Sequence, residues 1–395
     1  MKKILAILLS ILITISSVPA ASAMGLLLPI KGDADADGKV TAADARLILR
    51  ASVGLHTPFI LRRSLYDCDN DGKISAADAR KALRIAVGLE KFDNDNKTRE
   101  ERIKDFTDNV SAATLKNLMT EICALGTRSV LFPQKNLAAQ EYISGRLREY
   151  NVNFKRQTFT YNGTETANII STLKKGDENS EILLICTHFD CYDGNSGAID
   201  NASGVAALLH TIEIIKKNEI GFNGEIRIAF LSAEEMGYYG AYRYVNSLSA
   251  DEISRIKVFN IDMAGNSSLG GGKILTVSTE PVSPGTYPWR QAQENSVSKA
   301  IDSAKALLGN LGEEKYMSPV SAGRHDIVAF RKSGIPSVTL SWRETRAEAA
   351  YGSDFNLAPP SQIHTYLDTI ENFNVNSLYN TTRLILASLL LGYSD

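Results

Sequence analysis

Short apolar runs alternate with helix-period segments along residues 105–395, and this alternation constrains the fold more than any other feature. The first run, EILLICT at 181–187, is almost continuously apolar, as expected of a central strand that is covered on both faces. Such alternation predicts a three-layer α/β/α sandwich around a mainly parallel sheet. The expected strands are 181–187, 225–231, 258–262, 274–278 and 337–342, and the expected helices are 112–124, 137–150, 203–217, 239–247, 290–308 and 370–391.

Acidic and histidine side chains follow these strands at the points where the strands end, which is where open α/β sheets gather functional residues. The candidates are His188, Asp190, Asp200, Glu234, Glu235, Asp262 and His364. Imidazole and carboxylate are ligands that Zn²⁺ takes in catalytic sites. Two zinc ions need about five ligands with one carboxylate shared, and the set is large enough for that. Any one of these residues taken alone could instead be a salt-bridged or capping residue.

A duplication lies near the N-terminus, where the segment that begins at Asp33 recurs from Asp67. Each copy has Asp at loop positions 1, 3, 5 and 12, Gly at position 6 and a hydroxyl residue at position 9. Ca²⁺ takes six to eight oxygen ligands, and this spacing directs carboxylates toward one ion. A helix-period stretch follows each loop, 43–53 and 77–87, and ends at a glycine. The candidate calcium residues, with position 7 included, are Asp33, Asp35, Asp37, Lys39, Thr41 and Asp44, and Asp67, Asp69, Asp71, Lys73, Ser75 and Asp78.

Residues 32–90 resemble a type I dockerin, the duplicated loop–helix calcium module that docks onto a cohesin domain of a scaffolding protein. The resemblance implies two structural Ca²⁺ ions, a cohesin partner and a place in an extracellular, cellulosome-like complex. Loop positions 10 and 11, on which partner choice partly depends, are Ala-Ala at 42–43 and 76–77, where dockerins commonly have hydroxyl residues. The alternative is a purely structural pair of calcium loops.

Residues 105–395 resemble the secreted di-zinc aminopeptidases. The resemblance is carried, in order, by HFD, GAIDNASGVAALL, SAEEMGYYGAYRYV, NIDMAG, FRKSGIPSV and IHTYLDT. It implies two catalytic Zn²⁺ ions in a zinc exopeptidase domain. On this resemblance His188 and Asp262 would bind one zinc, Glu235 and His364 would bind the other, and Asp200 would bridge the two.

The same resemblance implies roles for further residues. Glu234 would be the general base, and Asp190 would hydrogen-bond the far nitrogen of His188 and fix its tautomer. One segment departs from the family, because Gly-Arg-His stands where many members have Ser-Asp-His, which puts the cationic Arg324 at the carboxylate position. Asp368 is expected to be a structural hydrogen-bonding residue rather than a ligand.

Residues 1–23 are expected to be a signal peptide. Lys2 and Lys3 precede an apolar run that ends at Ile15, and Ala-Ser-Ala at 21–23 offers small residues for cleavage. The apolar run is too short to cross a bilayer, which takes about 20 residues. The mature protein is therefore expected to be secreted, with no membrane contact after cleavage.

Composition and charge limit the possible partners of the protein and the roles of its remaining segments. The formal net charge is −2, and the chain has no long basic run, so we expect no nucleic-acid partner. The charged segment 91–104 lacks apolar periodicity and is expected to be a linker. The four cysteines are expected to be buried free thiols.

Together these features predict a secreted exopeptidase that removes N-terminal residues from peptide substrates and is attached to a scaffold through its dockerin. Two alternatives remain. Glutaminyl cyclases, which typically bind one zinc, and some carboxypeptidases share this scaffold, so the reaction could differ on the same fold. A catalytically silent domain for assembly or peptide binding is the other alternative, and the presence of Glu234 argues against it.

Overall fold

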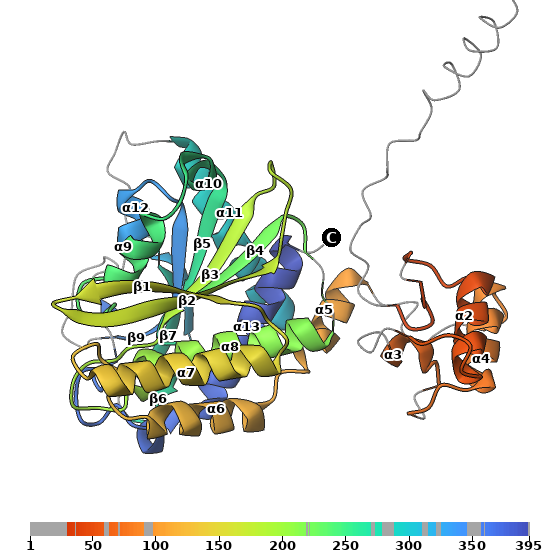
Figure 1. The fold of residues 1–395 in the computed structure, drawn as a ribbon, viewed down its shortest axis with the longest axis horizontal. Helices are drawn as coiled ribbons and strands as arrows, with labels where there is room; N and C mark the ends of the chain where they lie inside the picture. The colour runs from red at the N-terminus through yellow and green to blue at the C-terminus, as the bar shows by residue number, and fades with distance from the viewer. Residues whose placement is uncertain are drawn as a thin grey trace, which may run out of the picture. The chain divides into compact units, whose positions relative to one another are not determined.

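The computed structural model describes residues 30–35, 37–58, 63–69, 72–90, 98–218, 220, 222–269, 273–278, 288–309, 315–320, 325–345, 357–358 and 360–393. The chain forms two compact units, one ending at Glu90 and the other beginning at Lys91 (Figure 1). Within the described ranges, no helix combines the length and the apolar character that crossing a bilayer requires.

Two helices follow the two duplicated loops of the N-terminal unit: α2, Ala42–Ser52, and α4, Ala76–Ala86. The side chains of Thr41 and Ser75 cap them, as hydroxyl residues commonly do at the first free backbone N–H groups of a helix. The helices pack against each other, and the short helix α3, Arg63–Tyr66, separates them in sequence. Helices α2 and α4 both begin and end one residue earlier than the sequence predicts.

A mixed sheet forms the centre of the second unit, in the order β1-β2-β4-β3-β5-β9-β7-β8, with β10 paired to β9. The four strands β4, β3, β5 and β9 are parallel, and the antiparallel pairs lie toward the two edges. Its strands are β1 Lys155–Tyr161, β2 Thr164–Lys174, β3 Ile182–His188, β4 Glu225–Leu231, β5 Ile256–Ile261, β7 Lys273–Ser278, β8 Lys315–Val320, β9 Ser337–Thr345 and β10 Leu357–Ala358.

Helices cover both faces of this sheet, which gives the expected three layers (Figure 1). On one face α8, α11 and α13 pack together, and α6 packs against α8 and α13. On the other face α9 and α12 pack against each other and against the strands. The helices of this unit are α5 Arg99–Thr107, α6 Ala112–Ala124, α7 Pro133–Glu149, α8 Ser203–Lys217, α9 Tyr239–Val245, α10 Ala250–Arg255, α11 Pro288–Leu308, α12 Ile327–Lys332 and α13 Val375–Tyr393.

Strand β3 lies at the centre of the core, and all seven of its residues are buried. A strand that is covered on both faces cannot alternate apolar and polar residues, which is why its sequence is so uniformly apolar. The cysteines also belong to buried regions: Cys68, Cys123, Cys186 and Cys191 are all unpaired and buried. The expectation of buried free thiols is therefore confirmed.

The structure differs from the expected elements at several places, and the following differences have a clear physical reason. The antiparallel pair β1–β2 was not expected, because β1 (KRQTFTY) is a largely exposed edge strand without an apolar run. The second half of the expected linker is a helix, α5, which Thr98 caps and which buries Ile103. The last helix begins at Val375 rather than at 370, because the short strand β11, Phe373–Asn374, pairs with β6, Asn266–Ser267.

Candidate metal centre

The candidate residues gather at one edge of the sheet because β3, β4 and β5 are parallel and end there. His188 is the last residue of β3, and Asp262 directly follows β5. Glu234 and Glu235 lie in the turn after β4. Asp200 and His364 come from two loops, one before α8 and one before α13.

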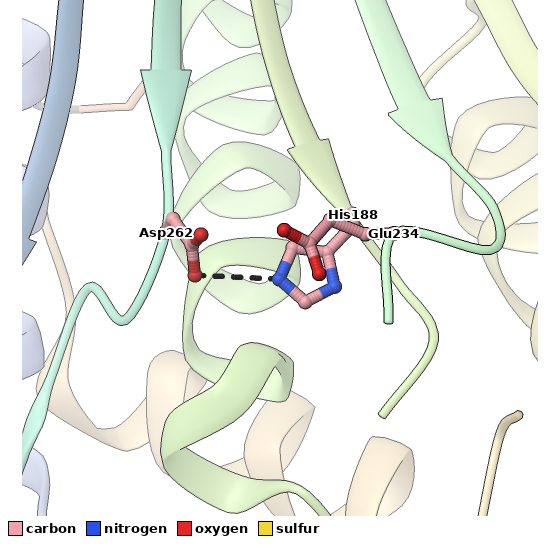
Figure 2. A group of neighbouring side chains, drawn as sticks. All are labelled: His188, Glu234 and Asp262. Carbon is pink, nitrogen blue, oxygen red and sulfur yellow. Dashed lines mark hydrogen bonds and ion pairs between the residues drawn. The ribbon is translucent and has the colours of Figure 1, made fainter. Parts of the chain in front are cut away.

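The first cluster consists of His188, Glu234 and Asp262, all of them buried (Figure 2). Nε2 of His188 lies 3.3 Å from Oδ1 of Asp262 and 3.2 Å from Oδ1 of Asp200. Figure 2 shows the Glu234 carboxylate over the same imidazole ring. Three side chains from the ends of three parallel strands therefore face one point.

The second cluster consists of Asp200, Glu235 and His364. Nε2 of His364 lies 3.1 Å from Oε2 of Glu235 and 3.4 Å from Oδ2 of Asp200. Asp200 thus turns one carboxylate oxygen toward each cluster. A carboxylate in this position can bridge two cations.

The donor atoms have the spacing that a pair of zinc ions requires. Ligand atoms bound tetrahedrally at about 2.0–2.1 Å from zinc lie about 3.3 Å from one another. The four distances given above from Nε2 of His188 or His364 to a carboxylate oxygen are 3.1 to 3.4 Å. Oδ1 of Asp200 and Oε1 of Glu235 are buried and have no hydrogen-bond partner among the described residues. The residues present therefore fit two divalent cations that prefer nitrogen and oxygen ligands.

The electrostatics of the clusters favour the same cations. Burial raises the pKa of Glu235 to about 7, and the neighbouring Asp200 carboxylate adds to the rise. Burial also raises the pKa of Glu234 well above the ordinary range of a glutamate. Hydrogen bonds to Asp200 and Glu235 raise the pKa of His364 to about 10. Burial therefore opposes the ionisation of both glutamates, and nearby cations would relieve that cost.

Asp190 lies beside His188, as expected, but its main contacts are with a different segment. Oδ1 of Asp190 is 3.6 Å from Nδ1 of His188, which is longer than a hydrogen bond. Its two carboxylate oxygens accept the backbone N–H groups of Glu234 at 3.1 Å and Glu235 at 3.2 Å. Asp190 therefore fixes the turn that carries both glutamates, a contact that the resemblance did not imply.

One carboxylate in this region was not among the residues predicted from the sequence. Arg324 stands where the family commonly has an acid, and Asp326, two positions later, is fully buried. Burial and the neighbouring Asp262 carboxylate raise the pKa of Asp326 to about 8, while His188 opposes the rise. Arg324 lies outside the described residues. The segment therefore places a buried acid near His188 and Asp262, at a position other than the one where the family's acid was expected.

Three further polar residues make hydrogen bonds to the backbone next to the candidate ligands. Asp368 accepts the backbone N–H groups of Ile199 at 2.6 Å and Asp200 at 3.3 Å, so the expectation that it is a structural hydrogen-bonding residue is confirmed. The buried Arg128 donates to the carbonyl groups of Phe189 and of residues 196–197, which flank the loop after β3. Neither contact has a local sequence signal, because each joins segments that are far apart in the chain.

Asn201 is the third of these residues, and it is fully buried. Its Nδ2 donates to Oγ1 of Thr187 at 3.0 Å and to the Ile261 carbonyl group at 3.2 Å. Its Oδ1 accepts the N–H groups of Gly204 at 2.9 Å and Met263 at 3.1 Å. Asn201 therefore joins the ends of β3 and β5 to the start of α8, next to three candidate ligands.

Replacing Gly204 by alanine should disturb this arrangement. An added Cβ would lie 2.4 Å from both the Asn201 Oδ1 and the Thr187 Oγ1 atoms. We expect Gly204→Ala to lower the free energy of unfolding by about 1–3 kcal/mol, as overpacking does in cores. Gly145 in α7 is the matched control, since a Cβ there meets nothing within 4 Å and alanine should stabilise the helix by about 0.5–1 kcal/mol. Denaturant titration of both variants measures the difference, and equal stabilities would contradict the packing argument.

The duplicated loops of the N-terminal unit also bring acidic residues together. Asp33, Asp35 and Asp44 form one group and Asp67, Asp69 and Asp78 the other. Asp44 and Asp78 are fully buried, and each also accepts backbone N–H groups of its own loop.

The remaining calcium candidates lie nearby in the chain but outside these two groups. Asp37 accepts the Lys39 N–H group, and the hydroxyl groups of Thr41 and Ser75 donate to the position-12 carboxylates. Lys73 belongs to the second loop. Asp71 lies outside the described residues.

Comparisons with known proteins identify both units. Residues 168–389 match the model of peptidase family M28, and residues 31–81 match the dockerin type I domain. The leupeptin-inactivating enzyme 1 of Streptomyces exfoliatus is 28% identical over 247 residues, which cover 61% of this chain and 52% of that protein. The aminopeptidase YwaD of Bacillus subtilis is 27% identical over 224 residues, 56% of this chain and 44% of that protein. The chain spans about half the length of these curated relatives.

Solved structures share the fold at lower identity. An aminopeptidase from Aneurinibacillus sp. strain AM-1 superposes with a TM-score of 0.58 at 17% identity, covering 74% of this chain and 96% of that one. The glutaminyl cyclase of Macrostomum lignano gives a TM-score of 0.58 at 18% identity, covering 77% and 94%. The fold is therefore common to peptidases and cyclases. The family model covers more than half of the sequence and includes all the candidate zinc ligands, so the chain belongs to peptidase family M28 and carries a type I dockerin domain.

Proposed function

We propose that this chain is a secreted di-zinc aminopeptidase that removes N-terminal residues from peptides and is attached through its dockerin to a cohesin on a scaffolding protein. The observation that carries the proposal is the position of Asp200, of which one oxygen faces His188 and the other faces His364. A carboxylate that is shared between two clusters of ligand atoms suits a pair of zinc ions better than a single ion. The names of the curated relatives support an aminopeptidase reaction.

Five residues would hold the metals. His188 and Asp262 would bind one zinc, Glu235 and His364 the other, and Asp200 both. Such a pair would lower the pKa of a bound water and polarise a carbonyl group.

Glu234 would move the proton in this reaction. Its carboxylate lies in the first cluster, and Asp190 holds its backbone in place. It would accept a proton from the attacking water and pass it to the leaving amine, as a general base and then a general acid.

The dockerin would bind two Ca²⁺ ions and a cohesin domain. The acidic groups of both loops support the calcium sites. Secretion is proposed from the signal-peptide pattern of residues 1–23 and from the dockerin, whose cohesin partners belong to extracellular scaffolds.

Metal analysis combined with a peptide panel tests the proposal. The panel contains matched peptides with free and with acetylated N-termini, and peptides that begin with glutamine. We expect two zinc ions per chain and release of single N-terminal residues from the free peptides alone. One zinc per chain with cyclisation of the glutamine peptides would favour a cyclase instead. Full zinc occupancy without turnover of any peptide would favour a silent domain.

A further inference from the structure

A buried chain of polar side chains leads away from the first cluster. Nδ1 of His325 lies 2.5 Å from Oδ2 of Asp262, and Nε2 of His325 contacts the Nη2 group of Arg343. The exposed fractions of the three residues are 3% for Asp262, 2% for His325 and 3% for Arg343. Charged groups are rarely buried to this extent without partners, so the contacts among these three side chains hold them in a defined arrangement.

The arginine fixes which nitrogen of His325 carries the proton. A guanidinium group has only donors, so Nε2 of His325 must accept from Arg343. In a neutral imidazole the other nitrogen is then protonated, and Nδ1 of His325 donates to Oδ2 of Asp262. His325 is thus held as a donor toward Asp262.

This bond leaves the two oxygens of Asp262 with different surroundings. Oδ2 is occupied by His325, whereas Oδ1 faces Nε2 of His188 at 3.3 Å. Rotation of the carboxylate would break the bond to His325. Only Oδ1 of Asp262 is therefore available to a cation beside His188.

The second cluster lacks a matching support within the described part of the chain. Glu235 Oε2 faces His364, but Glu235 Oε1 is buried without a hydrogen-bond partner there. His364 is also 44% exposed and stacks on the ring of Tyr192. The two candidate zinc positions thus differ in how firmly their carboxylates are held.

We infer that His325, oriented by Arg343, is a positioning residue that fixes Asp262 as a one-oxygen ligand and thereby sets the affinity of the zinc position shared with His188. The inference rests on the proposed function, because it takes Asp262 to be a zinc ligand. Hydrogen-bonded partners of metal ligands commonly change metal affinity by about 10–100-fold when they are replaced.

Zinc titration against a chromophoric chelator tests the inference without an activity assay. We expect His325→Leu to weaken one of the two bound zinc ions by about 10–100-fold and to leave the other unchanged. His325→Asn should stay close to wild type, because the asparagine amide can donate from about the position of Nδ1. Arg343→Met should weaken the same single zinc, since His325 then loses its orientation, and it serves as the test if His325→Leu does not fold.

His210→Leu is the matched control. His210 is another buried histidine, with Nδ1 2.9 Å from Oε2 of Glu213 and Nε2 accepting the Ser111 N–H group at 2.9 Å, outside both clusters. It should leave both zinc affinities unchanged. Unchanged zinc binding in both His325→Leu and Arg343→Met, or equal weakening of both zinc ions, would overturn the inference and leave the proposed function intact. A wild-type chain that binds fewer than two zinc ions would overturn the proposed function together with the inference.

Discussion

Replacing Glu234 by glutamine should leave two zinc ions bound and lower kcat by about 10²–10⁴-fold, the usual contribution of a general acid–base group. Glutamine has nearly the same size and hydrogen-bonding reach, but it cannot take a proton from water. The measurement is turnover of an aminoacyl-nitroanilide, with zinc counted in the same sample.

The neighbouring Glu235 provides the contrast. Both glutamates lie in the turn that Asp190 holds, and the backbone N–H group of each donates to the Asp190 carboxylate. Glu235→Gln should lower zinc content as well as turnover, since Oε2 of Glu235 is a donor of the second cluster. Glu234 lies as close to His188 and Asp262 as a ligand would, so the zinc count decides its role. Loss of zinc from Glu234→Gln would make it a ligand, and near-normal turnover would remove it from the chemistry.

The second prediction with a large expected effect is that the two units require different metals. We expect a chain stripped on a chelating resin to lose both cohesin binding and turnover. Calcium alone should restore helicity in the N-terminal unit and cohesin binding, because Asp44 and Asp78 are buried carboxylates that a cation would neutralise. Zinc alone should restore turnover to within about twofold of the untreated chain, as expected if the two units fold independently.

Four samples make this test complete: stripped, calcium alone, zinc alone, and both. Circular dichroism, cohesin binding and nitroanilide turnover are measured on each. Restoration of turnover by calcium alone would contradict the zinc assignment. Restoration of cohesin binding by zinc alone would contradict the calcium assignment.

Much of the second unit could be predicted from local patterns. Helices α6 and α8 and strand β4 have the bounds that the sequence predicts, because each shows a clear apolar period between residues that start or stop it. The edge strand β1 could not be found in this way, since its polar residues pair with β2 and bury little. Helix α5 was missed for a similar reason: its few apolar residues are buried by contact with α13, which lies far along the chain.

The candidate ligands could also be read from the chain, whereas their surroundings could not. His188, Asp262 and Glu235 follow apolar strands, and that position is a local feature of the sequence. The partners of Asp190 and Asp262 are set by contacts between segments that lie more than 40 residues apart. Asp326 was not predicted because it does not directly follow an expected strand, and only the structure showed that it is buried near His188 and Asp262.

The sequence by itself determined the type of each side chain at the strand ends, the duplicated acidic loops and the central apolar strands. These features depend on the spacing and the period of residues within short stretches of the sequence. Only the tertiary structure decided which oxygen of Asp200 faces which histidine, and that His325 and Arg343 stand behind Asp262. Such pairings follow from the packing of distant strands and loops into one dense interior, and no local pattern encodes them.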